Sequence, residues 1–185
     1  MSLTPAEAQS ALKDIEKTEN RTAASQHARA SAPFLIMWGV IWAVGYSVTA
    51  AAPGLSMVWL GLIILGVAGS FAISWRQSRG AGQDQQHTAR YFITFGIIGM
   101  FLSALMSIVR PLDYNQVSAI FPLIIGLFYA LLGIWSKGWR MLPLGLALIG
   151  LTTFGYFAIP QSYLYWMAGV GGGGLILGGV WMRSV

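Results

Sequence analysis

The segment that decides the fold runs from Gly39 to Trp75 and reads GVIWAVGYSVTAAAPGLSMVWLGLIILGVAGSFAISW. It consists of an apolar run, a short uncharged turn at Pro53-Gly54, and a second apolar run that closes before Arg76. Each run is close to the ~20 residues that a helix needs to cross a ~30 Å hydrocarbon layer. The segment therefore predicts a helical hairpin in a membrane.

The same plan occurs twice more along the chain. A Gly precedes a Pro by 14, 15 and 15 residues in the three copies, and that Pro precedes a Trp by 22, 24 and 21 residues. A cation follows the Trp each time. The copies are Gly39-Pro53-Trp75, Gly96-Pro111-Trp135 and Gly145-Pro160-Trp181, and the cations are Arg76, Lys137 and Arg183. This repeat predicts three related helical hairpins.

Composition agrees with a membrane location. Hydrophobic residues make up 56% of the chain and charged residues 9%, whereas soluble domains carry about 25% charged residues. Backbone polar groups in lipid must bond within their own segment, which favours helices. We therefore expect an all-α integral membrane protein with one six-helix transmembrane domain, residues 33–182. The expected spans are 33–52, 56–75, 91–110, 117–136, 141–159 and 163–182.

Residues 1–32 differ from the rest in being polar and charged. Thr4-Pro5-Ala6-Glu7 is typical of a helix start, with Thr as N-cap, Pro in the first turn and Glu reaching back to the cap. Apolar residues then recur at helical spacing at Ala8, Leu12 and Ile15. We expect an amphipathic cytoplasmic helix, either solvated or docked on a protein partner or a second copy of the chain.

Lys and Arg fall almost entirely on one side of the six expected spans. Ten of the 11 lie there, and only Arg110 lies on the other side. Because cations accumulate in cytoplasmic segments, both termini are expected in the cytoplasm, with the protein in the plasma (inner) membrane. Aromatic residues are expected at both boundaries, where amphipathic rings prefer to lie. They are Trp75, Tyr91, Trp135, Trp139 and Trp181 on the inner side and Trp59, Tyr114, Tyr163, Tyr165 and Trp166 on the outer side.

The last span is rich in glycine. Gly169/Gly173 and Gly174/Gly178 have the spacing of four that lets helix backbones approach closely in lipid. These glycines are predicted to pack helices inside the bundle. A homo-oligomeric interface, a flexible gate and a close approach of the backbone to a ligand remain the alternatives.

No expected span carries an ionisable residue in its middle, which argues against a proton relay. Several hydroxyls are candidates for lining a path for a neutral solute, unless they bond back to helix carbonyls. They are Ser103, Ser107, Thr152, Thr153 and Tyr156. The chain has no cysteine and no phosphate-binding glycine loop, nucleophile elbow or H-E-x-x-H motif. We predict no catalytic residues and no enzyme activity, and no nucleic-acid binding, because no basic face with interleaved aromatics is present.

The two histidines, His27 and His87, precede expected spans in similar surroundings, Gln-His-Ala-Arg and Gln-His-Thr-Ala-Arg. Shared repeat ancestry explains them; a metal site or a pH-responsive pair are the functional alternatives. A structural zinc needs four ligands, and no third or fourth is evident, so no metal or cofactor is predicted. A lipid-modifying enzyme would require His27, His87 and Arg140 to converge on one pocket.

Arg110 and Asp113 flank Pro111 in the second outer turn. They are the only charges expected on that side of the membrane. A short ion pair across the turn is the simple interpretation, and a contact with a solute at the outer mouth is the functional one.

The plan of three linked hairpins, with its Leu/Ile/Gly-rich texture over 33–182, resembles the small bacterial HdeD-type membrane proteins, which are associated with acid stress. The resemblance is one of plan and transfers no residue or role. Almost all of the polar part of the chain is expected inside the cell, and this distribution favours a non-enzymatic scaffold or stress-linked regulator whose N-terminal helix and 76–90 loop contact a cytoplasmic partner. The alternative is a transporter or channel for a small neutral or lipophilic solute, since internal repeats are common in transporters.

Overall fold

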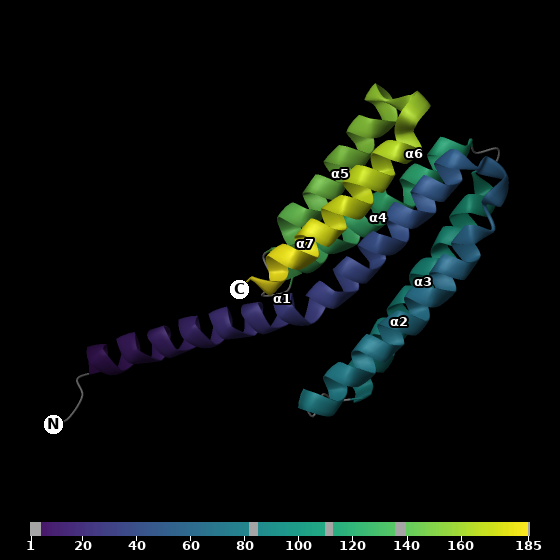
Figure 1. Ribbon diagram of the computed structural model, residues 1–185. Coiled ribbons are helices and arrows are strands. Elements are labelled where there is room, and N and C mark those ends of the chain that lie inside the picture. Colours follow the sequence, from purple (N-terminus) through teal and green to yellow (C-terminus); the bar gives the residue numbers. More distant parts are fainter. Residues whose placement is uncertain (1–4, 82–84, 110–112, 136–139, 185) are drawn as a thin grey trace.

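The computed structural model describes residues 5–81, 85–109, 113–135 and 140–184, and every secondary-structure element in these ranges is helical (Figure 1). Within these ranges, five helical segments are long and apolar enough to cross a membrane, as expected of an integral membrane protein. They are Ala28–Ala51, Val58–Gln77, Tyr114–Trp135, Met141–Ala158 and Pro160–Arg183.

The expected span at 91–110 falls in helix α3 (Gln85–Ile108). The apolar part found among the described residues, Gly96–Ile108, is shorter than a full span. The six-span arrangement therefore stays a prediction, while the helical character of this region is observed.

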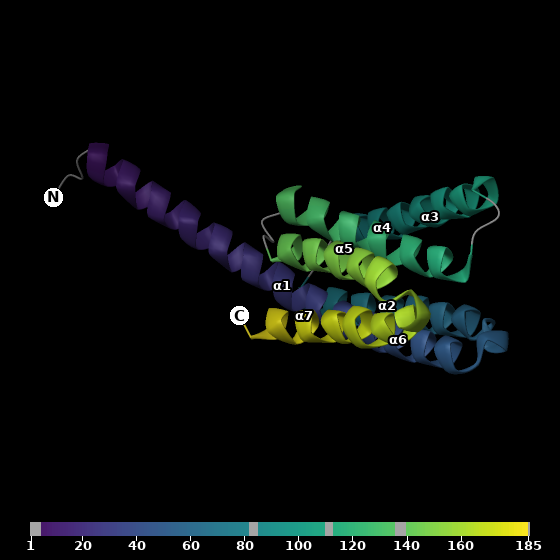
Figure 2. The same cartoon turned by 90° about the horizontal axis from the view of Figure 1, so that it is seen from above.

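Helix α1 (Pro5–Ala51) is 47 residues long and continuous. Its last 24 residues form the first membrane segment, and the part before them projects well beyond the other helices (Figures 1 and 2). The sequence places a boundary between residues 32 and 33, but the helix continues through it with Pro33 inside. The change from polar to apolar residues alters the helix's surroundings and leaves its backbone hydrogen bonding largely intact. Thr4, the expected N-cap, lies outside the described residues.

The other helices follow with short connections. Short 3₁₀ turns begin at Pro53 and Pro160, where proline fits because the first residues of a helical turn need no N–H partner. After the second turn, the chain passes through a π-helical segment, Met167–Gly172, before its last helix. The helices are α2 (Val58–Ala81), α4 (Tyr114–Trp135), α5 (Met141–Ala158), α6 (Tyr163–Trp166) and α7 (Gly173–Arg183).

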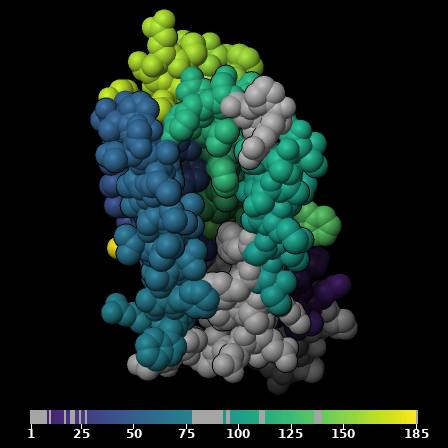
Figure 3. All heavy atoms as spheres, turned by 90° about the vertical axis from the view of Figure 1, so that its right-hand side faces the viewer, coloured from purple at the N-terminus to yellow at the C-terminus, as the bar shows by residue number. Residues whose placement is uncertain are grey.

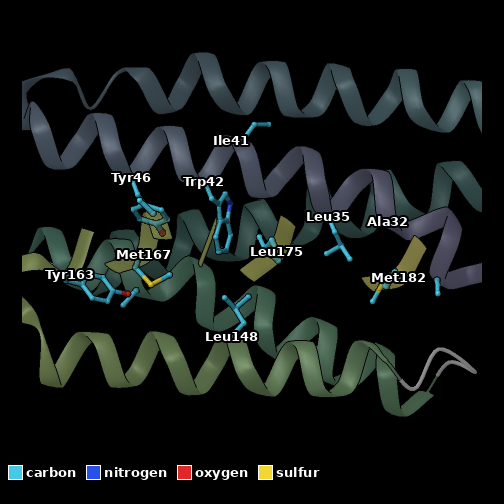
Figure 4. Packing of buried hydrophobic residues seen from close by; sticks show 13 residues of the cluster. Ala32, Leu35, Ile41, Trp42, Tyr46, Leu148, Tyr163, Met167, Leu175 and Met182 are labelled. Carbon is cyan, nitrogen blue, oxygen red and sulfur yellow. The ribbon is translucent and has the colours of Figure 1, made fainter. Parts of the chain in front are cut away.

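The core lies around α1, which packs against α7, the π-helical segment and α2, while α4 packs against α5. Figure 4 shows α1 side chains, including Leu35 and Trp42, directed towards Leu175 and Met182 of α7 and Leu148 of α5. The most extensive helix pairings are therefore those of α4 with α5 and of α1 with α7.

Helix α2 is attached along a narrow strip, with 6% of its membrane segment buried. Figure 3 shows a long hollow between α2 and α3, at the back of which α4 is visible. Side chains such as Ile64, Phe71 and Met100 are exposed on these two helices. Their apolar surfaces are suited to lipid.

The aromatic residues divide into two kinds. Trp75 and Trp135 are exposed, as expected of interfacial rings. Tyr163, expected at the outer interface, is instead only 1% exposed, and its ring packs edge-on against Tyr156 at a centroid distance of 5.8 Å. Tyr163 is therefore a core residue next to the Pro160–Ser162 turn.

Candidate functional site

Helix α1 approaches the π-helical segment and α7 through backbone contacts. A Cβ built on Gly39 would lie 2.8 Å from the carbonyl oxygen of Gly172, and one on Gly172 would lie 2.6 Å from the amide nitrogen of Ala43. Farther along the pair, a Cβ on Gly179 would lie 2.9 Å from the carbonyl oxygen of Ala32. Small residues on both helices thus form the close contact that favours association in lipid.

The four glycines predicted to pack helices lie in different surroundings. A Cβ on Gly178 would lie 2.8 Å from Cδ1 of Leu144 on α5, whereas a Cβ on Gly169, Gly173 or Gly174 would meet no atom within 4 Å. The π-helical turn explains this register, because its wider turns change which residues share a face. The sequence signal that could have identified the α1 side is the Gly39/Ala43 spacing of four.

A second close contact joins α4 and α5. A Cβ on Gly126 would lie 2.8 Å from Cγ1 of Ile149, and Gly145 faces the backbone of Ala130. Gly133 faces the backbone of Leu142. Gly126, Ala130 and Gly133 recur at spacings of four and three, a signal in the sequence that was not assigned to packing.

Two of the five hydroxyls proposed to line a solute path bond back to their own helix. Ser103 donates to the carbonyl of Gly99 at 2.9 Å and Ser107 to that of Ala104 at 2.7 Å, so both bond within α3. The Oγ1 of Thr152 and the Oη of Tyr163 are buried without a hydrogen-bond partner among the described residues. Thr152 lies on α5, which packs against the π-helical segment. Unpaired buried hydroxyls are uncommon. The hydroxyls of Thr152 and Tyr163 are therefore the polar groups inside the bundle that a bound water or solute could satisfy.

The projecting part of α1 meets the bundle at a proline. Pro33 has no N–H to donate to the carbonyl of the preceding turn, and proline inside a helix promotes a bend. At this place the Nε2 of Gln77, near the end of α2, donates to the carbonyl oxygen of Ala30 at 2.9 Å. A side chain of α2 thus fixes the base of the projection.

Farther out, the projection carries an uncovered apolar stripe. Leu12 is 66% exposed and Ile15 is 55% exposed. They lie three residues apart and hence on one face. Lys13 and Asp14, also exposed, point to the opposite side at 100° per residue.

The remaining predicted residues are only partly within the described structure. The side chains of His27 and His87, and all of Arg110, lie outside it. Asp113 accepts a hydrogen bond at Oδ1 from the amide of Gln116 at 2.7 Å, while its own amide donates to Oε1 of Gln116 at 3.0 Å. This reciprocal pair is a capping box at the start of α4. Among the described residues, no group of three or more potential metal ligands occurs.

The chain was compared with models of protein families, with curated proteins and with solved structures, and no match was found in any of the three comparisons.

Proposed function

We propose that the protein is a non-enzymatic membrane scaffold or stress-linked regulator that presents the N-terminal part of α1 to a cytoplasmic protein partner. The observation that carries the proposal is the continuation of α1 beyond the bundle with Leu12 and Ile15 exposed. Residues 5–27, which precede the membrane segment, correspond to about 35 Å of helix at ~1.5 Å per residue.

An uncovered amphipathic helix calls for a partner on physical grounds. Most helical stability in proteins comes from packing an apolar face, since short isolated helices are marginal in water. In recognition by a groove, an amphipathic helix inserts residues at such spacings into an apolar surface. The stripe of Leu12 and Ile15 suits this mode of binding.

The base of the projection supports the same role. We call the projecting part of α1, residues 5–27, the arm. The hydrogen bond from Gln77 to the carbonyl of Ala30 connects the base of the arm to α2. An arm held at its base loses less conformational entropy on binding than a freely moving one. If a partner moved the arm, the hydrogen bond between Gln77 and Ala30 would pass that movement to α2.

Site-specific photo-crosslinking in cells tests the proposal. A photoreactive residue at position 12 or 15 is expected to give one discrete adduct, while the same residue at position 13 or 14 gives little. The double substitution Leu12→Asp/Ile15→Asp should abolish the adduct formed from a probe at position 8. Lys13→Gln/Asp14→Asn, on the opposite face, should leave it unchanged.

The mass of the adduct separates the outcomes. An adduct with twice the mass of the chain would identify a second copy as the occupant. Equal crosslinking to lipid or to many proteins from all four positions would contradict a specific docking face, and the scaffold proposal with it.

The proposed location is the plasma membrane, with both termini in the cytoplasm and six spans as three hairpins. The supporting observation is that the apolar segment of α2 ends at Gln77, next to Arg76, that α7 ends at Arg183 and that α5 begins after Arg140, all at one end of the bundle (Figure 1). We call this the basic end. Cytoplasmic placement of the basic end follows from the distribution of cations in membrane proteins.

Transport of a small neutral or lipophilic solute is the second candidate. The hollow between α2 and α3 (Figure 3) and the unpaired hydroxyl of Thr152 favour it. Proteoliposomes that show no faster flux of uncharged solutes than protein-free vesicles would remove it. If Thr152→Val left the solute flux unchanged, a role of Thr152 in lining the solute path would be contradicted.

A further inference from the structure

Arg140 holds a charged group in an unusual position at the basic end. Its guanidinium carbon lies 4.9 Å from the centroid of the Trp181 ring on α7. Its Nη1 is buried and has no hydrogen-bond partner among the described residues. Because an arginine stays charged in proteins, this nitrogen is a cationic donor that no described residue satisfies, on a side chain that as a whole is only partly buried. Such a group is costly unless an anion or another acceptor completes it.

The local field also favours an anion. Arg140 occupies the N-cap position of α5, and among the described residues no side-chain hydrogen bond caps that helix end. The first N–H groups of a helix carry a partial positive charge, which disfavours a cation there and favours an anion. In the sequence, no acidic residue follows Asp113. The segments α5 and α7 thus supply no carboxylate of their own.

The position along the membrane segments indicates the source of the anion. Arg140 precedes the Met141–Ala158 segment by one residue, and Trp181 lies near the end of the segment Pro160–Arg183. Lipid headgroups are found at this depth, and basic pockets between transmembrane helices bind anionic ones. Leu177, one turn before Trp181, is 71% exposed and offers an apolar surface beside the ring. Arg140 therefore offers a cation to a lipid phosphate, and Leu177 offers an apolar surface to an acyl chain of the same lipid.

We propose that Arg140 and Trp181 form a binding site for the phosphate of an anionic phospholipid at the basic end of the bundle. The planar guanidinium donates to phosphate oxygens, a geometry that arginine provides and lysine does not. The indole face of Trp181 holds the guanidinium in place by a cation–π contact. This site is independent of the N-terminal arm and of its proposed partner.

The test uses the purified full chain and native mass spectrometry of bound lipid. Phosphatidylglycerol is expected to bind about tenfold more tightly than phosphatidylcholine with the same acyl chains, a difference of about 1.4 kcal/mol. Arg140→Gln should remove this preference. Arg76→Gln is the matched control, since Arg76 is an exposed cation at the same end and its replacement changes the charge equally.

Two further variants keep the test informative if Arg140→Gln does not fold, as judged by circular dichroism and elution volume. Arg140→Lys keeps the charge without the planar fork, and Trp181→Leu removes the ring. Both are expected to reduce the preference for phosphatidylglycerol.

Three outcomes would overturn the proposal. The first is an equal loss of preference in Arg76→Gln and Arg140→Gln, which would indicate general electrostatic attraction. The second is equal binding of the two lipids by the natural chain. The third is displacement of phosphatidylglycerol by millimolar inorganic phosphate, which would show that the site takes the free ion.

Discussion

At the scale of single residues, the nearest backbone decides what a glycine contributes. Gly172 and Gly173 are neighbours in the chain, yet a Cβ on Gly172 would lie 2.6 Å from the amide nitrogen of Ala43 and a Cβ on Gly173 would meet nothing within 4 Å. A methyl group at the first position must push two helices apart, and one at the second points into open space. The difference in stability between alanine variants at these two positions therefore measures how closely α1 packs on the π-helical segment that ends at Gly172.

We expect Gly172→Ala to destabilise the bundle by about 1–3 kcal/mol, the usual cost of overpacking. Gly173→Ala should be neutral or stabilising by up to about 1 kcal/mol, because alanine favours the helix. Reversible unfolding in mixed micelles measures both values. Equal stabilities of the two variants would contradict the α1–α7 contact.

Two buried tyrosines offer a second comparison. The hydroxyl of Tyr46 donates to the carbonyl of Ser118 at 2.9 Å, whereas that of Tyr163 is unpaired. Tyr46→Phe should therefore cost about 0.5–1.5 kcal/mol, and Tyr163→Phe should cost nothing or stabilise. The same unfolding assay applies. A loss of stability in Tyr163→Phe would indicate that a bound water or solute satisfies this hydroxyl.

At the scale of elements, the most informative feature is the bend region of α1. Pro33 removes one backbone donor, and Gln77 of α2 donates to the carbonyl of Ala30 nearby. A hydrogen bond near the membrane boundary competes with less water than an exposed one, so it can hold the arm in one direction. The direction of the arm is then set by α2.

Gln77→Leu should broaden the distribution of distances between spin labels at positions 9 and 161, because the arm loses its anchor. Both positions are exposed, and the chain has no cysteine to interfere with labelling. Double electron–electron resonance measures the distribution. Arg76→Gln serves as control, and an unchanged width in Gln77→Leu would contradict the clamp.

The helices could be predicted from the sequence far better than their partners. Apolar length alone located segments such as Tyr114–Trp135 and Met141–Ala158 to within three residues. The sequence shows less clearly which helices pack against each other, because residues that face lipid and residues that face another helix are both apolar. Contact faces such as Gly126/Gly133 differ from lipid-facing surfaces only in side-chain size. The register of the last span depended on a π-helical turn in a run of glycines, which carry no side chains to signal it. The unpaired Nη1 of Arg140 became visible only in three dimensions.

At the scale of the whole molecule, five apolar helical segments and a basic end define how the protein would lie in a bilayer. The ends of α2 and α7 and the start of α5 lie at the basic end, and the turns at Pro53–Leu55 and Pro160–Ser162 lie at the other (Figure 1). The projecting part of α1 leaves the bundle at the basic end. Arm and cations are therefore expected on the same side.

A single cysteine at position 161 is expected to react with a membrane-impermeant maleimide in intact cells. A cysteine at position 9 should react only after the cells are permeabilised, because the basic end is proposed to face the cytoplasm. Labelling yields from the two single-cysteine variants, normalised to yields in detergent, measure the topology. Labelling of position 9 in intact cells would reverse the orientation.

The contact between Ala43 and Gly172 also has a consequence for biogenesis. At about 5–20 residues per second, the ribosome adds the 129 residues from Val44 to Gly172 in about 6–26 s. During that time the first inserted helix waits without its main partner, so insertion chaperones or quality-control proteases have their best opportunity to recognise its glycine-lined face. Slow codons or truncation before residue 172 would lengthen that exposure and shorten the lifetime of the nascent protein.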